Sequence, residues 1–136
     1  MIGGGQLSRM THSASVGLAV GFRVLAQSGS DSAAQVVADC HIGQHDDRAN
    51  VLAAATDVDV VTFDHEHVPL DILEELEARG VAVHPAPTAL QFAQDKAQMR
   101  QRLSEFDVPQ PRWAVVETTG EVEAFASEWP VILKVS

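Results

Sequence analysis

The sequence predicts an α/β domain built on an open parallel sheet, and three observations lead to this prediction. Short apolar runs alternate with helix-like segments over residues 1–84. A glycine turn, Gly3-Gly4-Gly5, joins the end of a strand to the start of a helix, so its backbone N–H groups can approach an anion closely. A buried strand over residues 58–63 is followed by the acidic Asp64 and Glu66. Because such sheets bind ligands at the carboxyl edge of their strands, we expect the turn and the carboxylates to share a site.

Strands and helices are predicted to alternate along the first half of the chain. Strands are expected at 1–2, 23–26 and 41–43, and helices at 6–20 and 46–55, with a polar loop at 28–32. Gly21 follows the first helix, where a C-cap glycine would end it. The strand at 58–63 is the most convincing, since it is short, β-branched and followed by polar residues.

The next elements complete the first predicted domain. Pro69 suits the first turn of a helix, and an apolar stripe of leucines at positions 70, 73 and 76 runs along that helix as far as Gly80. A last strand is expected at 81–83. Two prolines in His84–Pro87 then indicate a boundary.

Beyond this boundary we expect a long helix at 88–106, a break at Val108–Pro111, a strand at 113–116, a helix at 120–127 and a strand at 131–135. The corresponding domains are 1–84, a linker and helix at 85–107, and the start of another domain at 108–136. Because the last strand has no following turn or helix, we expect the chain to be part of a longer protein, shortened at both ends.

The composition excludes several classes of function. A formal net charge of −10 over 136 residues disfavours non-specific binding to nucleic acid or to an anionic membrane, because clustered Lys and Arg drive both. Cys40 is the only cysteine and cannot form an intrachain disulfide, and the sequence shows no secretory signal. The cytosol is therefore the expected compartment.

The glycine turn admits more than one interpretation. A dinucleotide fingerprint needs a third glycine, where this chain has Ser8, and a carboxylate at the end of the second strand, where it has Ala26-Gln27-Ser28. That interpretation is disfavoured, and a Walker-type loop is excluded because no Gly-Lys-Ser/Thr follows. A turn that only lets the first helix pack on the sheet remains an alternative.

The run Asp64-His65-Glu66-His67 also leaves alternatives open. Alternate residues of a strand share a face, so a metal site is conceivable. We favour Asp64 and Glu66 facing the ligand crevice while His65 and His67 pack or meet solvent, and a solvated strand end remains the simplest alternative. The other histidines are expected to be structural; they are His12, His41, His45 and His84.

Six segments of the chain occur in an order that is found in a known family; they are Ile2–Met10, Thr62–Pro69, His84–Pro87, Ala93–Lys96, Val108–Trp113 and Pro130–Lys134. Together they resemble the 5-(carboxyamino)imidazole ribonucleotide synthetases of the ATP-grasp superfamily. The resemblance covers essentially the whole chain. It implies a Rossmann-like pre-ATP-grasp domain, then a linker helix and the first elements of an ATP-grasp domain. The family's glycine loop over the ATP phosphates and its acidic metal ligands have no counterpart here, so the catalytic residues are expected beyond Ser136.

The resemblance also implies site residues and partners. Lys96 and Lys134 match ATP-binding positions, and Lys134 is a lone lysine in an apolar run, which needs a sheet edge or an anionic partner. The positions that match ribonucleotide-binding ones are Gly5, Gln6, Leu7, Asp64 and Glu66. The implied activity is an ATP-dependent carbon–nitrogen ligase in purine biosynthesis that carboxylates aminoimidazole ribonucleotide with bicarbonate and forms ADP and phosphate.

The implied cofactors are ATP and Mg²⁺, with no metal ligand in this chain, and a homodimer is implied for the full-length protein. By itself this chain is expected to be inactive. The alternatives are a non-catalytic Rossmann-like nucleotide-binding module and a structural or oligomerisation domain.

Overall fold

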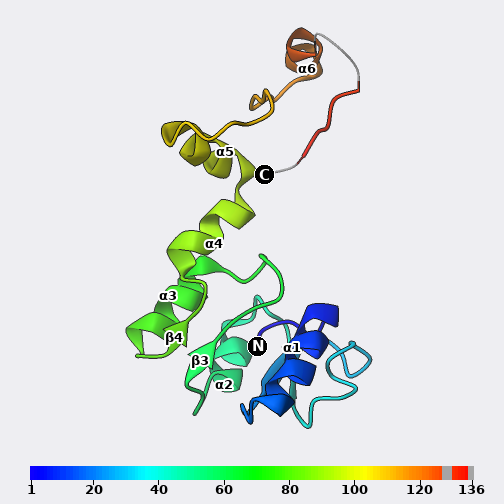
Figure 1. Cartoon of the computed structure of the whole chain (residues 1–136), viewed down its shortest axis with the longest axis vertical. Coiled ribbons are helices and arrows are strands. Elements are labelled where there is room, and N and C mark those ends of the chain that lie inside the picture. The colour runs from blue at the N-terminus through cyan, green and yellow to red at the C-terminus, as the bar shows by residue number, and fades with distance from the viewer. Residues whose placement is uncertain (127–129, 135–136) are drawn as a thin grey trace. The chain divides into compact units, whose positions relative to one another are not determined.

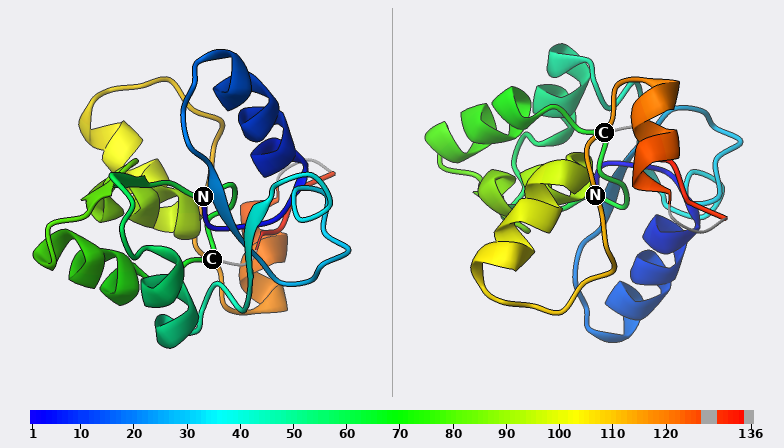
Figure 2. Two further views of the ribbon diagram at one scale, coloured as in Figure 1. Left: turned by 90° about the horizontal axis from the view of Figure 1, so that it is seen from below. Right: turned by 90° about the horizontal axis from the view of Figure 1, so that it is seen from above.

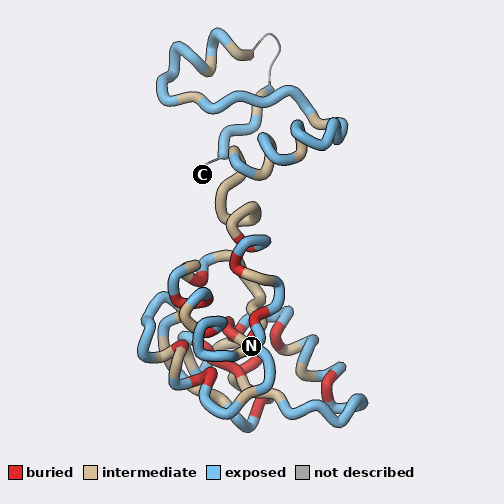
Figure 3. Tube along the Cα trace, turned by 90° about the vertical axis from the view of Figure 1, so that its left-hand side faces the viewer, coloured by how far each residue is buried: buried red, intermediate tan, exposed pale blue. Residues whose placement is uncertain are grey.

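The computed structural model describes residues 1–126 and 130–134 (Figure 1). The chain divides into two units, Met1–Leu90 and Gln91–Ser136, each of which is described by itself. Every buried hydrophobic residue of the described part lies at or before Leu90. Figure 3 accordingly shows the buried positions, in red, gathered in the first unit, which therefore contains the hydrophobic core.

A parallel sheet organises the first unit. Strand β1 (Arg23–Ala26) pairs with β2 (Asp39–Ile42), and β3 (Val60–Val61) pairs with β4 (Ala82–Val83). Ile2 forms parallel bridges to both Leu25 and Phe63 and so connects the two pairs. The order across the sheet is β2, β1, residues 1–3, β3 and β4. The predicted α/β class with a parallel sheet is confirmed.

The chain order of these strands reverses at one place. On one side of residues 1–3 lies β1, which is the next strand in sequence. On the other side lies the later β3 segment, which comprises residues 60–63. Their pairing is closed by hydrogen bonds from the Gly3 amide to the Leu25 carbonyl (2.9 Å) and from the Asp64 amide to the Ile2 carbonyl (3.1 Å). The carboxyl ends of neighbouring strands part at such a reversal, which leaves a crevice for ligands.

Three helices pack around the sheet. They are α1 (Gln6–Gly17), α2 (Arg48–Ala54) and α3 (Leu70–Ala78). The blue α1 and the green α3 lie on opposite sides of the strands (Figure 2). The leucine stripe of α3 forms much of its contact with the core, because Leu73 and Leu76 are among the largest fully buried side chains. Asp47 caps α2 by accepting a hydrogen bond from the Asn50 amide (3.0 Å).

The end of α1 differs from the prediction. The helix stops at Gly17, and Ala19 (φ 54°) adopts the left-handed conformation that we expected of Gly21. The amides of Ala19 and Val20 donate to the carbonyls of Val16 and Ser15, which is the Schellman pattern of a helix end. The glycine prediction failed because an alanine, at some cost in backbone strain, takes the cap position.

The helix predicted at 88–106 is two helices. α4 (Pro87–Gln94) and α5 (Lys96–Glu105) are separated by Asp95, whose backbone is extended. Its side chain accepts hydrogen bonds from the amides of Ala97 (2.9 Å) and Gln98 (3.0 Å), so it caps α5. An aspartate in mid-pattern was overlooked as a helix start, which is why one helix was predicted.

The remaining elements are fewer than expected. α6 (Thr119–Phe125) begins at a capping box of Thr118 and Glu121, close to the predicted helix at 120–127, whose Ser127 lies outside the described residues. Residues 113–116 and 131–134 form no strand, so both strand predictions are wrong for these described residues, while Val135 lies outside them. The strand expected at 58–63 is short, comprising Val60–Val61 and the bridge at Phe63.

Candidate functional site

A cavity of about 480 Å³ lies at the carboxyl edge of the strands, where their order reverses. Four of the five predicted ribonucleotide positions line it, although Asp64 is far in sequence from the glycine turn. Its lining residues are Gly4, Gly5, Gln6, Leu7, Gln27, Asp31, Ser32, His45, Asp64, His65 and His67. The fold therefore brings the glycine turn and the end of the β3 segment to one place, as the parallel-sheet prediction requires.

Asp64 is held by the glycine turn. Its Oδ2 accepts hydrogen bonds from the Gly5 amide (3.0 Å) and from the Ser8 hydroxyl (3.0 Å), and only 6% of its side chain is exposed. The Ser8 hydroxyl also lies 2.6 Å from the Gly3 carbonyl. The anion that the turn attracts is thus a carboxylate of the protein itself.

The three glycines fit closely around this carboxylate and the neighbouring strand. A Cβ added to Gly3, whose φ is +105°, would lie 1.8 Å from Asp64 Oδ1, and one added to Gly5 would lie 2.8 Å from Oδ2. A Cβ on Gly4 would lie 2.6 Å from the Cβ of Ala26. The turn needs glycines because side chains would displace Asp64 and β1.

The start of α1 remains available to a ligand. Gly5 is the N-cap residue, and no side chain caps the helix. The N–H groups of a first turn have no acceptor inside their own helix, and here Gln6 and Leu7 line the cavity. Because the positive end of the helix dipole lies there too, an anionic or hydroxyl-rich group fits this part of the cavity.

The carboxylate of Asp31, on the loop after β1, is also hydrogen-bonded to backbone amides. Its Oδ2 accepts hydrogen bonds from the amides of Gln27 (2.9 Å) and Ser28 (3.2 Å). Both carboxylates of the cavity lining, Asp31 and Asp64, therefore serve to shape loops at the ends of β1 and the β3 segment.

Three histidines gather beside the turn. The ring centroids of His45 and His65 are 4.6 Å apart, and those of His65 and His67 are 5.6 Å apart. Burial, followed by the neighbouring His45, lowers the pKa of His65. We expected the histidines at 65 and 67 to face away from the crevice, and this expectation is wrong because both line the cavity.

His45 was missed as a site residue. It follows β2, and the same reasoning that places Asp64 in the crevice applies to the carboxyl end of every strand in a parallel sheet. Its Nδ1 lies 2.8 Å from Nε2 of Gln27, which follows β1. Gln27 directly follows β1 and His45 comes three residues after β2, and this closeness to strand ends was the signal available in the sequence.

The other predicted site residues are placed as follows. Glu66 is half-buried and does not line the cavity. Lys96 is half-buried in the first turn of α5, where its Nζ donates to the Ala93 carbonyl. Lys134 is exposed in a segment without regular structure. Both lysines belong to the second unit.

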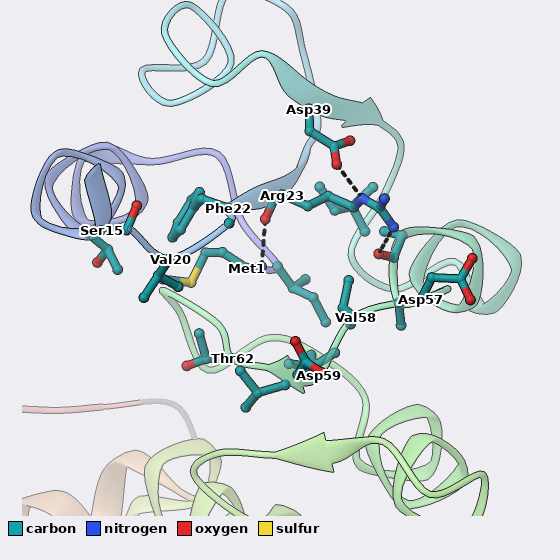
Figure 4. Close-up of a pocket in the computed structure, with 18 of the residues that line it drawn as sticks. Met1, Ser15, Val20, Phe22, Arg23, Asp39, Asp57, Val58, Asp59 and Thr62 are labelled. Carbon is teal, nitrogen blue, oxygen red and sulfur yellow. Dashed lines mark hydrogen bonds and ion pairs between the residues drawn. The ribbon is translucent and has the colours of Figure 1, made fainter. Parts of the chain in front are cut away.

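A second cavity, of about 740 Å³, lies at the amino ends of the strands (Figure 4). The amine of Met1 donates to the Arg23 carbonyl there (2.8 Å), and Arg23 forms an ion pair with Asp39 (2.8 Å). Burial lowers the pKa of this amine to about 6. The lining is mainly apolar and lies away from the glycine turn, so we do not assign the ligand site to it.

Among the described residues, no group of three or more His, Cys, Asp or Glu side chains is arranged to hold a metal ion. Within the same residues, no helix has the length and apolar character needed to cross a membrane.

Comparison with known proteins identifies the class of domain that this fold and site define. Residues 1–94 match the model of the ribonucleotide synthetase preATP-grasp domain, and the chain belongs to that family. Over 98% of its length, the chain is 48% identical to the N5-carboxyaminoimidazole ribonucleotide synthase of Mycobacterium tuberculosis. It spans 32% of the length of that relative.

Solved structures agree with this result. The N5-carboxyaminoimidazole ribonucleotide synthetase of Thermus thermophilus matches 91% of the chain, with a TM-score of 0.79 and 32% identity, and the chain covers 35% of it. The synthase of Aspergillus clavatus, in complex with ADP and 5-aminoimidazole ribonucleotide, matches 82% of the chain with a TM-score of 0.73 and 32% identity; the chain covers 30% of it. The predicted family resemblance is confirmed.

Proposed function

We propose that the chain is part of an ATP-dependent ligase that carboxylates 5-aminoimidazole ribonucleotide with bicarbonate, forming 5-carboxyaminoimidazole ribonucleotide, ADP and phosphate in purine biosynthesis. In this reaction ATP activates bicarbonate as carboxyphosphate, and the exocyclic amine of the ribonucleotide attacks the activated carbon. The relatives carry these names, and one solved relative holds ADP and the ribonucleotide.

One observation supports the proposal that this chain contributes to binding of the ribonucleotide. Gly5, Gln6, Leu7 and Asp64 line a single cavity at the reversal of strand order, with an uncapped helix start directed at it. The amides of Gln6 and Leu7 and the Gln6 side chain supply hydrogen bonds to a phosphate or ribose. We assign ribonucleotide binding to this cavity, with Glu66 as the nearby carboxylate that contacts ribose hydroxyls and Asp64 as the residue that fixes the turn.

The second unit is proposed to supply two contacts to ATP. Lys96 and Lys134 carry positive charges that would neutralise phosphate oxygens, since phosphoryl transfer depends mostly on positioning and charge neutralisation. The described residues form no metal site. They do not fit a Mg²⁺ ion, so we derive no metal step from them and place the metal ligands and the catalytic residues in the rest of the full-length protein. On the resemblance alone, we also propose a cytosolic homodimer for that protein.

Calorimetric titration with 5-aminoimidazole ribonucleotide tests the binding role on the chain itself. Gln6→Ala should weaken binding, while Gln101→Ala, an exposed glutamine of α5, serves as the matched control. Loss of one hydrogen bond to a charged group corresponds to about 1.5–3 kcal/mol. Equal affinity in both variants would remove the cavity from the proposal.

The reaction itself is tested with the full-length product of the parent gene. Phosphate release with ATP and bicarbonate should depend on 5-aminoimidazole ribonucleotide, whereas this 136-residue chain should show no turnover. A full-length protein that binds the nucleotide without ribonucleotide-dependent phosphate release would favour a non-catalytic nucleotide-binding module.

A further inference from the structure

The loop after β1 places a serine hydroxyl beside the side chain of Gln6. Oγ of Ser32 lies 3.4 Å from Oε1 of Gln6, and both residues line the cavity. A carbonyl oxygen can only accept a hydrogen bond, so the serine hydroxyl is the donor. This contact holds the oxygen of the Gln6 amide, and the amide nitrogen, Nε2, is the end that remains for a ligand.

Ser32 is itself anchored to α1 and to the glycine turn. Nη1 of Arg9 donates to the Ser32 carbonyl at a distance of 3.2 Å. The amide of the next residue, Ala33, donates to the Gly4 carbonyl at 2.8 Å. Ala33 is fully buried in the core of the first unit. Because these contacts fix the backbone on both sides of the Ser32 side chain, the hydroxyl has a defined position beside Gln6.

The charge of Arg9 favours the same orientation of the Gln6 amide. Gln6 and Arg9 are three positions apart on α1, and side chains at this spacing lie on one face of a helix. Arg9 is half-buried, and its guanidinium group binds the Ser32 carbonyl. A positive charge on this face attracts the oxygen of the Gln6 amide and repels its NH₂ group. Nε2 of Gln6 therefore stays available as a donor.

We propose that Ser32 is a positioning residue for ribonucleotide binding: its hydroxyl holds Oε1 of Gln6, so that Nε2 of Gln6 donates to a phosphate or ribose oxygen. This inference rests on the proposed function, which gives Gln6 a ligand contact. A side chain that is already ordered loses less rotamer entropy when the ligand binds, so Ser32 raises the affinity without touching the ligand.

The length of the contact fits a role in the complex. An O–H···O hydrogen bond usually measures about 2.5–3.0 Å, and the Ser32–Gln6 contact is longer than that. Hydrogen bonds in sites without their ligand are often long and tighten in the complex. We therefore expect the contact to affect ligand affinity more than stability.

Calorimetry of the chain with 5-aminoimidazole ribonucleotide tests the inference through a double-mutant cycle. Ser32→Ala should weaken binding about fivefold, because the Gln6 side chain loses the hydrogen bond that orders it. In a chain that already carries Gln6→Ala, Ser32→Ala should change the affinity by less than about twofold, because the residue through which Ser32 acts is gone.

Two further variants separate positioning from a general effect on the loop. Ser32→Thr keeps the hydroxyl and should retain the affinity within about twofold. Ser30→Ala is the matched control, because it removes an exposed hydroxyl of the same loop that contacts Ser28 at 2.8 Å, and its affinity should be unchanged. Thermal unfolding followed by circular dichroism should give Ser32→Ala and Ser30→Ala the same Tm.

The outcomes of the cycle distinguish this inference from the proposed function. Weaker binding by Ser32→Ala that disappears in the presence of Gln6→Ala supports both. If Gln6→Ala weakens binding while Ser32→Ala does not, or if their effects simply add, the role of Ser32 is overturned and the proposed function stands. Unchanged affinity in Gln6→Ala, or no binding by the unaltered chain, overturns both.

Discussion

The amide of Gly5 donates a hydrogen bond to Oδ2 of Asp64 across 59 positions of sequence, at a distance of 3.0 Å. This contact joins the glycine turn to the end of the β3 segment and occupies one of the donors that a Rossmann-like turn would offer to a phosphate. The amide of Gly5 therefore already has an acceptor within the protein. Asp64 holds the turn in place, and the N–H groups at the start of α1 remain for contacts with a ligand.

Asp64→Ala should destabilise the first unit by about 1–3 kcal/mol, because the Gly5 amide loses its acceptor and the buried Ser8 hydroxyl keeps only the Gly3 carbonyl. Urea unfolding followed by circular dichroism measures the loss. Asp59→Ala replaces an exposed aspartate just before β3 and is the matched control. Equal midpoints for the two variants would show that the carboxylate does not hold the turn.

Glu66→Gln and Asp64→Asn should behave differently in the full-length enzyme. Glu66→Gln should raise the KM for 5-aminoimidazole ribonucleotide by about tenfold, equivalent to about 1.4 kcal/mol, and leave the KM for ATP unchanged. Asp64→Asn should lower the Tm as well, because its carboxylate is part of the fold. A KM for the ribonucleotide that neither variant changes would place ribose recognition elsewhere.

Gly4→Ala should cost about 1–3 kcal/mol of stability, since its Cβ would lie 2.6 Å from the Cβ of Ala26 and 2.8 Å from Oδ2 of Asp31. Gly29→Ala is the control, because nothing lies within 4 Å of its added Cβ. Thermal unfolding of the two proteins gives the comparison. A destabilisation shared by both variants would point to a general effect of alanine in loops.

The stability of the chain should rise between pH 6 and pH 8. Burial lowers the pKa of the Met1 amine from its ordinary value of 8.0 to about 6, so between these values the unfolded chain binds more protons than the folded chain. The full difference amounts to about 2–3 kcal/mol and is absent below pH 6. Acetylation of the amine removes the titrating group. Urea midpoints that rise equally with pH in the acetylated chain would assign the effect to other groups.

Asp95→Ala should shorten or destabilise α5, because the amides of Ala97 and Gln98 lose their cap. Hydrogen bonds from Gln98 lower the pKa of Asp95, so this contribution is lost as the pH falls below the ordinary value of 3.8. Helicity measured by circular dichroism, with Glu123→Ala as an exposed control, tests the effect. A greater loss of helicity in the control would contradict it.

The sequence predicted the parts of the fold that depend on local patterns. The strand at 23–26 and the leucine stripe of α3 followed from periodicity and are found as predicted. The interruption at Asp95 and the cap at Ala19 depend on which single residue leaves helical geometry, and neighbouring residues were equally plausible on pattern alone.

The site was predicted in part. The parallel sheet predicted that the glycine turn and Asp64 lie close together. It did not predict that the Asp64 carboxylate accepts hydrogen bonds from Gly5 and Ser8, because these depend on distances that no sequence pattern encodes. The gathering of His45 with His65 required the order of the strands, because the two residues come from separate loops.

Ile2 links the two strand pairs, and this position has a consequence for the order of folding during synthesis. The middle strand leaves the ribosome before both of its neighbours, and its second partner, Phe63, follows 61 positions later. Until then, the edge that faces the β3 segment has no strand to pair with, which is the circumstance in which nascent chains aggregate. Closing the sheet through so distant a pairing is also slow, because the loop between the partners must be ordered first. A pause in translation once Phe63 has left the ribosome would allow Ile2 to pair with it before the second unit emerges.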